Sequence, residues 1–241
     1  MKMELLCATM EVEVQEEYPG QLGTWEEKAT AGWDANCVNV LFNTKENNLG
    51  VVGSYERLYK ESDKDTDVLI YAHDDVIMHE EGWDERILSA FNDPSVGVVG
   101  FGGAVRHGNP NLYKVPYHLP HLGRSGYFSN VDDAEVHGQR FTGACDVAVL
   151  DGYVLAIRRV LLDRMGGWAL LQRIGIDFIA YDYAACALAH RFGYRCRVVG
   201  VRAHHLGGRT STVVGVQQRS YDDAHWAYYN EFRNEMPWTC Q

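Results

Sequence analysis

The chain has 241 residues, of which 46% are hydrophobic and 23% are charged. This length suits one α/β domain, and the composition excludes a disordered chain because it supplies enough apolar residues for a core. The net charge of −11 is uneven: residues 1–100 carry 7 basic and 21 acidic side chains, and residues 101–241 carry 15 and 12. An acidic first half indicates either a solvated surface or a cation-binding face, and the mildly basic second half leaves room for an anionic partner.

The cysteines and the apolar segments bear on the cellular compartment. Six cysteines are scattered without a CxxC pair, a pattern typical of reduced thiols in a cytoplasmic protein. The apolar start Leu5–Met10 is too short for a signal peptide, and no apolar run is long enough to span a bilayer. We therefore expect a soluble cytoplasmic protein without an integral membrane segment, in the host cytoplasm if a phage encodes it. The oligomeric state is left open.

Strands and helices are expected to alternate along the chain, which predicts an α/β fold with a mostly parallel sheet and helices on both faces. In the first hundred residues we expect strands over Leu5–Thr9, Val38–Phe42, Asp67–Ala72 and Val96–Gly100, and helices over Thr24–Gly32, Val51–Tyr59 and Gly82–Phe91.

The second half begins with residues 101–145, which show no clear periodicity and are expected to form an irregular insertion or lid. Beyond it we expect strands over Val147–Ile157 and Arg195–Val201, helices over Arg158–Met165 and Ala180–Phe192, and a docked helix in the aromatic-rich tail. We therefore treat residues 1–241 as one domain, made of a first half (1–100), the 101–145 segment, a second half (146–208) and a helical tail (209–241).

A histidine and two aspartates, His73-Asp74-Asp75, follow the clearest predicted strand. In open α/β sheets, ligands bind outside the carboxyl ends of the strands. Mg²⁺ and Mn²⁺ require hard oxygen ligands, and one or two carboxylates together with phosphate oxygens are sufficient. Aspartate pairs are also common on ordinary surfaces, so only their position after the strand favours a metal site.

Four segments in the same order resemble the family 2 glycosyltransferases. An Asn-x-Gly segment precedes a helix in NNLGVVGSYERLY, and a strand ends in a His-x-Asp form of the Asp-x-Asp metal motif in DVLIYAHDDVIMHEEGWDERI. The run LDGYVLAIRRVLLDRMGGW resembles the acceptor-side strand and helix of that family. The run FIAYDYAACALAHRFGYRCRVVGVRAHH resembles the helix that carries the catalytic base and the strand that leads to a metal-binding histidine.

This resemblance implies a GT-A fold, Rossmann-like in type, a nucleotide-sugar donor (a UDP-sugar is favoured) and Mn²⁺ or Mg²⁺. Asp75 would bind the metal, and Asp74 or His73 would support it or contact the donor ribose. Either His204 or His205 would be a further ligand, with imidazole favouring Mn²⁺. The donor side would include Asn48 and Gly50.

On the acceptor side, the resemblance makes Asp182 the general base. The helix dipole would keep a carboxylate in the first turn ionised, and Asp177 is available to cap the helix in its place. The alternative is that Asp182 only stabilises the helix. Asp151 and Gly152 would shape the acceptor pocket, where a glycine lets substrate approach the backbone or simply marks a bulge. Trp168 would either stack on a sugar or belong to the core.

Three departures from the family pattern leave alternatives open. His73 replaces the first aspartate of the metal motif, Tyr181 stands where a second acidic residue is usual, and no base-reading aspartate is identifiable near the first strand. The missing carboxylate favours a non-catalytic binding module of the same fold. A sugar nucleotidyltransferase is a further alternative, but no Gly-rich, basic N-terminal loop is visible.

We expect an inverting glycosyltransferase whose hydroxyl acceptor is a glycan. The alternative acceptor is a hydroxymethylated base in DNA, as for phage-type DNA glycosyltransferases. The 101–145 segment interleaves basic and aromatic side chains, which is compatible with a lid over the donor or with contacts to DNA. The candidate phosphate contacts are Arg106, Lys114, Arg124 and Arg140.

Overall fold

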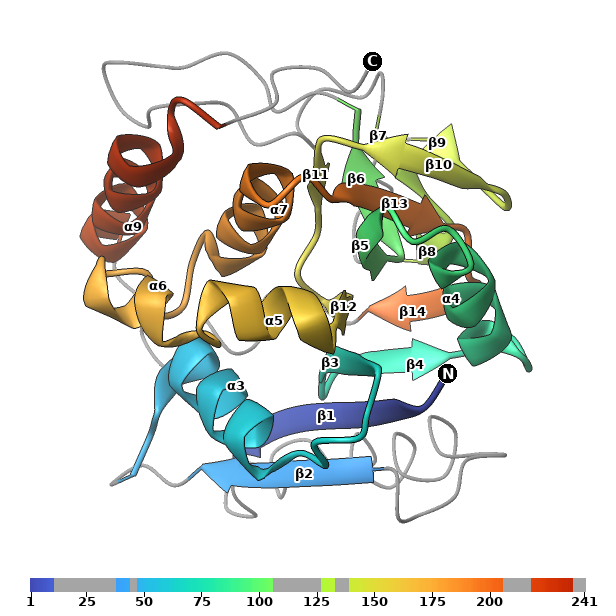
Figure 1. Cartoon of the computed structure of the whole chain (residues 1–241), viewed down its shortest axis with the longest axis horizontal. Coiled ribbons are helices and arrows are strands. Elements are labelled where there is room, and N and C mark those ends of the chain that lie inside the picture. The colour runs from blue at the N-terminus through green and yellow to red at the C-terminus, as the bar shows by residue number, and fades with distance from the viewer. Residues whose placement is uncertain (11–37, 44–46, 106–126, 133–138, 206–217, 236–241) are drawn as a thin grey trace.

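The computed structural model describes residues 1–10, 38–43, 47–105, 127–132, 139–205 and 218–235. Within them, a central sheet has the strand order β10-β13-β5-β12-β3-β1-β2 (Figure 1). Five of its seven strands run the same way, and β10 and β12 run antiparallel to their neighbours. The strands are β1 (Met3–Met10), β2 (Val38–Asn43), β3 (Val68–His73), β5 (Val96–Gly100), β10 (Ala144–Val147), β12 (Val154–Arg158) and β13 (Arg195–Val199).

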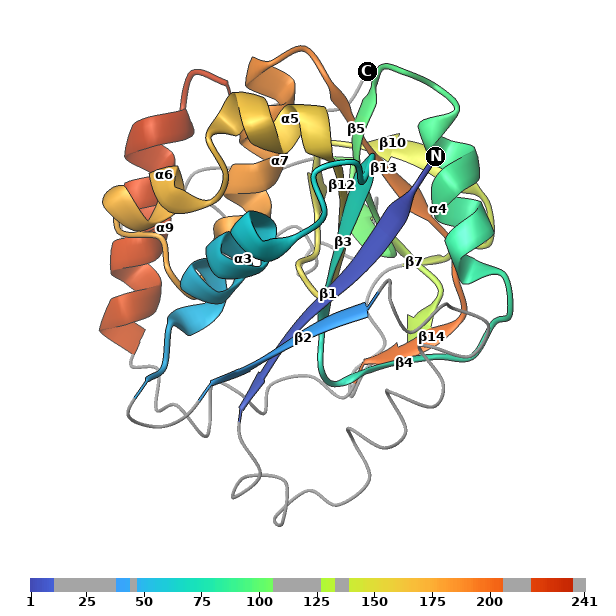
Figure 2. The same ribbon diagram turned by 60° about the horizontal axis from the view of Figure 1, so that its bottom comes forward.

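Helices cover both faces of this sheet, as the sequence predicts. α4 lies alone on one face, and the other described helices lie on the opposite face (Figures 1 and 2). The helices are α3 (Gly50–Glu61), α4 (Trp83–Phe91), α5 (Arg159–Met165), α6 (Ala169–Arg173), α7 (Tyr181–Arg191) and α9 (Gln218–Phe232). This arrangement confirms the predicted α/β fold with a mostly parallel sheet and helices on both faces.

The central strand β3 is buried on both sides. Leu69 and Tyr71 contact the core beneath α3 and α7, whereas Val68 and Ile70 contact the core beneath α4. All four side chains are fully buried, which explains the continuous apolar run in the sequence. A strand held this firmly fixes the position of whatever follows its carboxyl end.

Two small sheets lie beside the carboxyl ends of the central strands. One has the order β4-β14-β8, and the other has the order β11-β6-β7-β9. The first contains β4 (Val76–Met78), β14 (Ala203–His205) and β8 (Val131–Asp132); the second contains β11 (Val149–Leu150), β6 (Gly102–Ala104), β7 (Tyr127–Ser129) and β9 (Gln139–Arg140).

These sheets correct two expectations from the sequence. The strand expected over Val147–Ile157 is divided, because the chain leaves the central sheet after β10, pairs with β6 and turns at Asp151-Gly152 before β12. The described parts of residues 101–145 contain short strands rather than only irregular structure. The helix α6 lies where no element was expected, and the helix predicted over Thr24–Gly32 lies outside the described residues.

The predicted tail helix is α9, which packs on α7 through buried Tyr228 and Phe232. Four of the eight buried residues of α7 are alanines, so neighbouring elements can pack close to its backbone. In the described part of the chain, no helix is long and apolar enough to cross a bilayer. Of the described cysteines, Cys7, Cys186 and Cys196 are buried and Cys145 is partly buried.

Candidate active site

The end of β3 and the end of β14 bring three metal-ligating side chains together. His73 is the last residue of β3, and Asp75 immediately precedes β4. Because β14 pairs antiparallel with β4, His205 lies opposite Val76 and so next to Asp75. Residues 130 positions apart in the sequence therefore meet through one short strand pairing.

The distances within this cluster suit a divalent cation. His205 Nε2 lies 3.3 Å from Asp75 Oδ1, and His73 Nδ1 lies 3.9 Å from the same oxygen. One ligand atom from each residue falls within 4.8 Å of the others. Asp75 Oδ1 is buried and makes no hydrogen bond of good geometry to the described residues. Two imidazoles and a buried carboxylate fit Mn²⁺ well, because imidazole nitrogen is a better ligand for Mn²⁺ than for Mg²⁺.

The structure separates the two candidate histidines. Successive residues of a strand point to opposite faces, so only one of the pair can face Asp75. His205 does so, and its ring stacks on Tyr153 with 4.9 Å between ring centroids. The His204 ring instead lies 6.5 Å from that of His79, on the other side of the small sheet. His205 is therefore the metal-ligand candidate.

Asp74 is not one of the three residues of the candidate metal cluster. Burial is the main cause that raises the pKa of the Cys7 thiol, and the charges of Asp74 and then Asp75 follow. Asp74 contributes in the same way to the raised pKa of Tyr55. The half-buried Asp74 carboxylate is thus close enough to β1 and α3 for its charge to act on both Cys7 and Tyr55.

Asn48 and Gly50 form the turn that begins α3. Asn48 Oδ1 accepts a hydrogen bond of 2.9 Å from the Gly50 amide, and Gly50 has φ +68°. A side chain at Gly50 would overlap the Asp177 carboxylate. Asp177 also accepts a hydrogen bond from the Gly53 amide, so it lies against the start of α3. The expectation that Asp177 caps the helix of Asp182 is wrong, because α7 has no side-chain cap.

Asp182 lies in the first turn of α7, as predicted, but its ionisation differs from the expectation. Burial and then the nearby charge of Asp151 raise its pKa to about 7. The hydrogen bond of 2.9 Å that Asp182 Oδ1 accepts from the Tyr183 amide lowers the pKa only in part. The helix dipole therefore does not keep this carboxylate fully ionised. A carboxyl group with a pKa near neutrality can take up and release a proton at physiological pH.

Asp151 and Gly152 form the turn between β11 and β12. Asp151 accepts a hydrogen bond of 3.2 Å from the Tyr127 hydroxyl. The space in front of Gly152 is filled by Tyr181, whose hydroxyl a Cβ at this position would overlap. The reason for a glycine here is thus the approach of Tyr181, in addition to any approach of substrate.

Trp168 lies in the core. It is fully buried, and its ring is 5.1 Å from the Tyr71 ring and 5.4 Å from the Tyr55 ring. The core alternative holds, because no face of this indole is open to a sugar.

Of the four candidate phosphate contacts, the described residues include only Arg140. Its guanidinium makes an ion pair with Asp132 and donates to the Val131 carbonyl. Arg106, Lys114 and Arg124 lie outside the described residues.

Sequence reasoning missed two tyrosines of this site. Tyr153 stacks on His205, and the Tyr181 hydroxyl lies 2.6 Å from His73 Nε2. In the sequence, Tyr181 stands out only because it occupies the position where the family usually has a second acidic residue. Its position directly before Asp182 is the one signal that connects it to the site.

Residues 46–231 match a family described as glycosyltransferase-like. The chain belongs to this glycosyltransferase-like family. No curated protein matches it. The chain is also similar in structure to GalNAc-T7 solved with UDP, GalNAc and Mn²⁺, with 11% identity and a TM-score of 0.50 over 86% of this chain. It spans 43% of the GalNAc-T7 chain, and the likeness supports a shared GT-A glycosyltransferase fold.

Two further solved structures are similar to this chain. The mannosyltransferase PcManGT from Pyrobaculum calidifontis, in complex with GDP-Man and Mn²⁺, has 12% identity and a TM-score of 0.49 over 97% of this chain and 70% of its own. The protein A197 from STIV has 17% identity and a TM-score of 0.47 over 86% of this chain and 87% of its own.

Proposed function

We propose that this glycosyltransferase-family protein transfers a sugar, with inversion, from a nucleoside diphosphate sugar to a hydroxyl acceptor. The observation that carries the proposal is the convergence of His73 and His205 on Asp75 Oδ1, a buried carboxylate oxygen that lies 3.3 Å from His205 Nε2. These three residues would hold Mn²⁺ or Mg²⁺. When bound, the cation would neutralise the charge that develops on the departing diphosphate.

Asp182 is the proposed general base. Its carboxylate takes the proton of the acceptor hydroxyl while the acceptor oxygen bonds to the anomeric carbon from the face opposite the diphosphate. The bond from the anomeric carbon to the diphosphate oxygen breaks, and its electron pair leaves with the nucleoside diphosphate. A pKa of about 7 suits this role, because the base is then available at neutral pH and still has appreciable proton affinity.

The neighbourhood of Asp182 argues against the non-catalytic alternative. That alternative is based on the carboxylate missing at Tyr181. Asp151 supplies a second carboxylate in space, since its charge is one of the causes that raise the pKa of Asp182. A pair of interacting carboxyl groups beside a metal-ligand cluster is a costly arrangement for a module that only binds. Asp151 is the proposed acceptor-side partner of this pair.

The donor is proposed to be a UDP-sugar, bound on the side of Asp74, Asn48 and Gly50. The UDP and Mn²⁺ in the GalNAc-T7 structure support testing this nucleotide and this cation first. The direct test is a nucleotide-release screen over UDP- and GDP-sugars, with Mn²⁺ and with excess EDTA. Release that requires Mn²⁺ supports the proposal, and unchanged release in EDTA contradicts the metal role.

A glycan is the proposed acceptor. The DNA alternative requires cationic groups that face a phosphate backbone, and the ion pair of Arg140 with Asp132 already occupies one candidate. Binding to DNA would weaken steeply with salt because phosphate contacts release counterions, whereas binding to a neutral glycan would not. A salt titration of acceptor binding, with hydroxymethylated DNA as the competing probe, distinguishes the two.

A further inference from the structure

Tyr181 connects the helix of the proposed base to the proposed metal ligands. It is the first residue of α7 and directly precedes Asp182. Ala180 before it has φ +65° and is the one non-glycine residue with a positive φ in the described ranges. An alanine pays on the order of 1 kcal/mol for this conformation. The backbone is therefore strained at Ala180, directly before the residue whose side chain points into the site.

The ring of Tyr181 is fixed by the aromatic core. It is 5% exposed, and its centroid lies 5.7 Å from that of Tyr55 in an edge-on arrangement and 6.3 Å from that of Trp168. Gly152 leaves room for the hydroxyl, which a Cβ at that position would overlap. The hydroxyl therefore reaches the candidate metal cluster, and its position is set by the aromatic core and by the turn at Gly152.

The partners of this hydroxyl favour one direction for its hydrogen bonds. It lies 3.1 Å from the Gly152 carbonyl oxygen and 2.6 Å from His73 Nε2. A carbonyl oxygen can only accept, and a tyrosine hydroxyl has one proton. When that proton goes to Gly152, the Tyr181 oxygen must accept a proton from His73 Nε2. Tyr181 also shares a side-chain hydrogen bond with the neighbouring Tyr55 hydroxyl.

The consequence lies on the other side of the imidazole ring. A neutral histidine that carries its proton on Nε2 has a lone pair on Nδ1. His73 Nδ1 is the atom that faces Asp75, 3.9 Å from Oδ1. The opposite tautomer would direct an N–H into the cluster and could not bind a cation there.

We propose that Tyr181 is a positioning residue that holds His73 in the Nε2–H tautomer, with Nδ1 directed at the metal. This inference rests on the metal role proposed above. Partners of this kind fix the orientation and tautomer of ligating histidines, and their loss typically weakens metal binding 10- to 100-fold. Tyr181 thereby makes metal affinity depend on the start of α7, the same turn that carries Asp182.

The test combines the histidine tautomer with the affinity for the metal alone. The ¹⁵N shifts of labelled imidazoles report the tautomer in the metal-free protein, and the His73 signal is assigned by its loss in His73→Gln. Mn²⁺ affinity is measured by electron paramagnetic resonance of the free ion. In the wild type we expect the Nε2–H tautomer. In Tyr181→Phe we expect loss of that preference and a Kd for Mn²⁺ raised about 10- to 100-fold.

The matched control is Tyr59→Phe, which also removes one hydroxyl hydrogen bond, to Asp163 at 2.6 Å between α3 and α5. It should leave both measurements unchanged. A second variant, Gly152→Ala, should displace the Tyr181 hydroxyl and reproduce the effects of Tyr181→Phe.

The outcomes separate this inference from the proposed function. An Nδ1–H tautomer in the wild type overturns the inference even if neither variant folds. Wild-type Mn²⁺ affinity in a folded Tyr181→Phe variant overturns it as well, and the metal site then stands without it. No Mn²⁺ binding by the wild type overturns the metal role and this inference together.

Discussion

At the scale of single residues, the site depends on which atoms face one another. Asp75, His73 and His205 converge, while the adjoining Asp74 is not part of the cluster and the His204 ring lies beside His79. Asp182 is placed so that burial and Asp151 raise its pKa to about 7. The chemistry therefore depends on alternation along a strand and on the turn that begins a helix.

The two adjacent histidines give a matched pair of variants. His205→Gln removes a nitrogen that lies 3.3 Å from Asp75 Oδ1, so we expect the Kd for Mn²⁺ to rise at least about 10-fold. His204→Gln changes the ring beside His79 and should leave the Kd within about twofold. Isothermal titration with Mn²⁺ measures both. Equal weakening by the two changes would contradict the placement of His205 in the site.

The ionisation of Asp182 predicts a pH profile for turnover. The base must be deprotonated, so kcat should fall as the pH drops through about 7, rather than through the ordinary carboxyl range near 4. Asp182→Asn should reduce kcat at least about 100-fold with little change in donor KM. A variant that retained wild-type kcat would show that Asp182 serves only the helix.

The same pKa shift predicts a gain in stability when the charge is removed. A carboxyl group whose pKa is raised by folding costs stability that increases as the pH rises from about 4 to 7 and is fully expressed above 7. After allowance for partial exposure, Asp182→Asn should stabilise the fold by about 1–2 kcal/mol at pH 8 and by almost nothing at pH 4. Urea unfolding at the two pH values measures this difference.

At the scale of elements, the sequence predicts the strands that form the buried sheet and fails where short strands leave it. The apolar run that forms β3 and the helical spacing in α7 are strong local signals. The pairing of β14 with β4, which selects His205, depends on two three-residue strands that are distant in sequence. The division of Val147–Ile157 has one local signal, the turn-forming pair Asp151-Gly152, but the pairing of its first part with β6 has none. A contact of Tyr181 with His73 likewise follows only from the packed fold.

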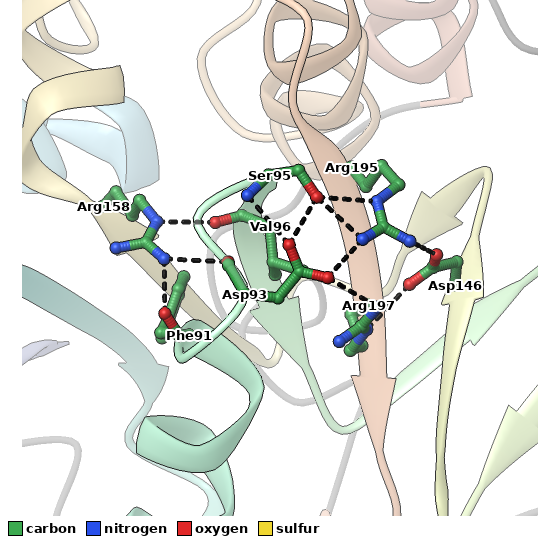
Figure 3. A network of polar contacts seen from close by, with 8 residues as sticks. All are labelled: Phe91, Asp93, Ser95, Val96, Asp146, Arg158, Arg195 and Arg197. Atoms are coloured by element: carbon green, nitrogen blue, oxygen red, sulfur yellow. Dashed lines mark hydrogen bonds and ion pairs between the residues drawn. The ribbon is translucent and has the colours of Figure 1, made fainter.

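The opposite edge of the sheet is held by a polar network, shown in Figure 3. Asp93 accepts hydrogen bonds from the Ser95 hydroxyl and amide, and it makes ion pairs with Arg195 and Arg197. Arg195 and Arg197 also bind Asp146 on β10. The network connects the turn after α4 to the amino end of β13 and to the edge strand, away from the metal-ligand cluster.

Removing the Asp93 charge should therefore affect stability and spare turnover. The hydrogen bonds from Ser95, followed by those from Arg195, lower the pKa of Asp93 to about 2. Its contribution to stability is thus present above about pH 4 and is lost as the pH falls toward 2. Asp93→Asn should lower Tm at pH 7, and the difference from wild type should shrink at pH 3. Thermal melts at both pH values, with kcat at pH 7 as the control, test this role.

At the scale of the whole molecule, the central sheet separates two functions. Ion pairs hold its amino edge, and its carboxyl edge carries the candidate metal ligands and, directly after Tyr181, the proposed base. This is where open α/β sheets place their ligands. The glycosyltransferase-like family and the GT-A fold agree with that division. The remaining question is whether the carboxyl edge performs metal-dependent transfer.

The most direct measurement is the Mn²⁺ dependence of nucleotide release from a donor sugar, compared between the wild type and Asp75→Asn. This substitution removes the charge of a buried ligand with almost no change in volume, so the fold should be retained. We expect release by the wild type to saturate with Mn²⁺, and release by Asp75→Asn to fall at least about 100-fold with the circular dichroism spectrum unchanged. Wild-type release by a folded Asp75→Asn variant in excess EDTA would contradict a metal-dependent transferase.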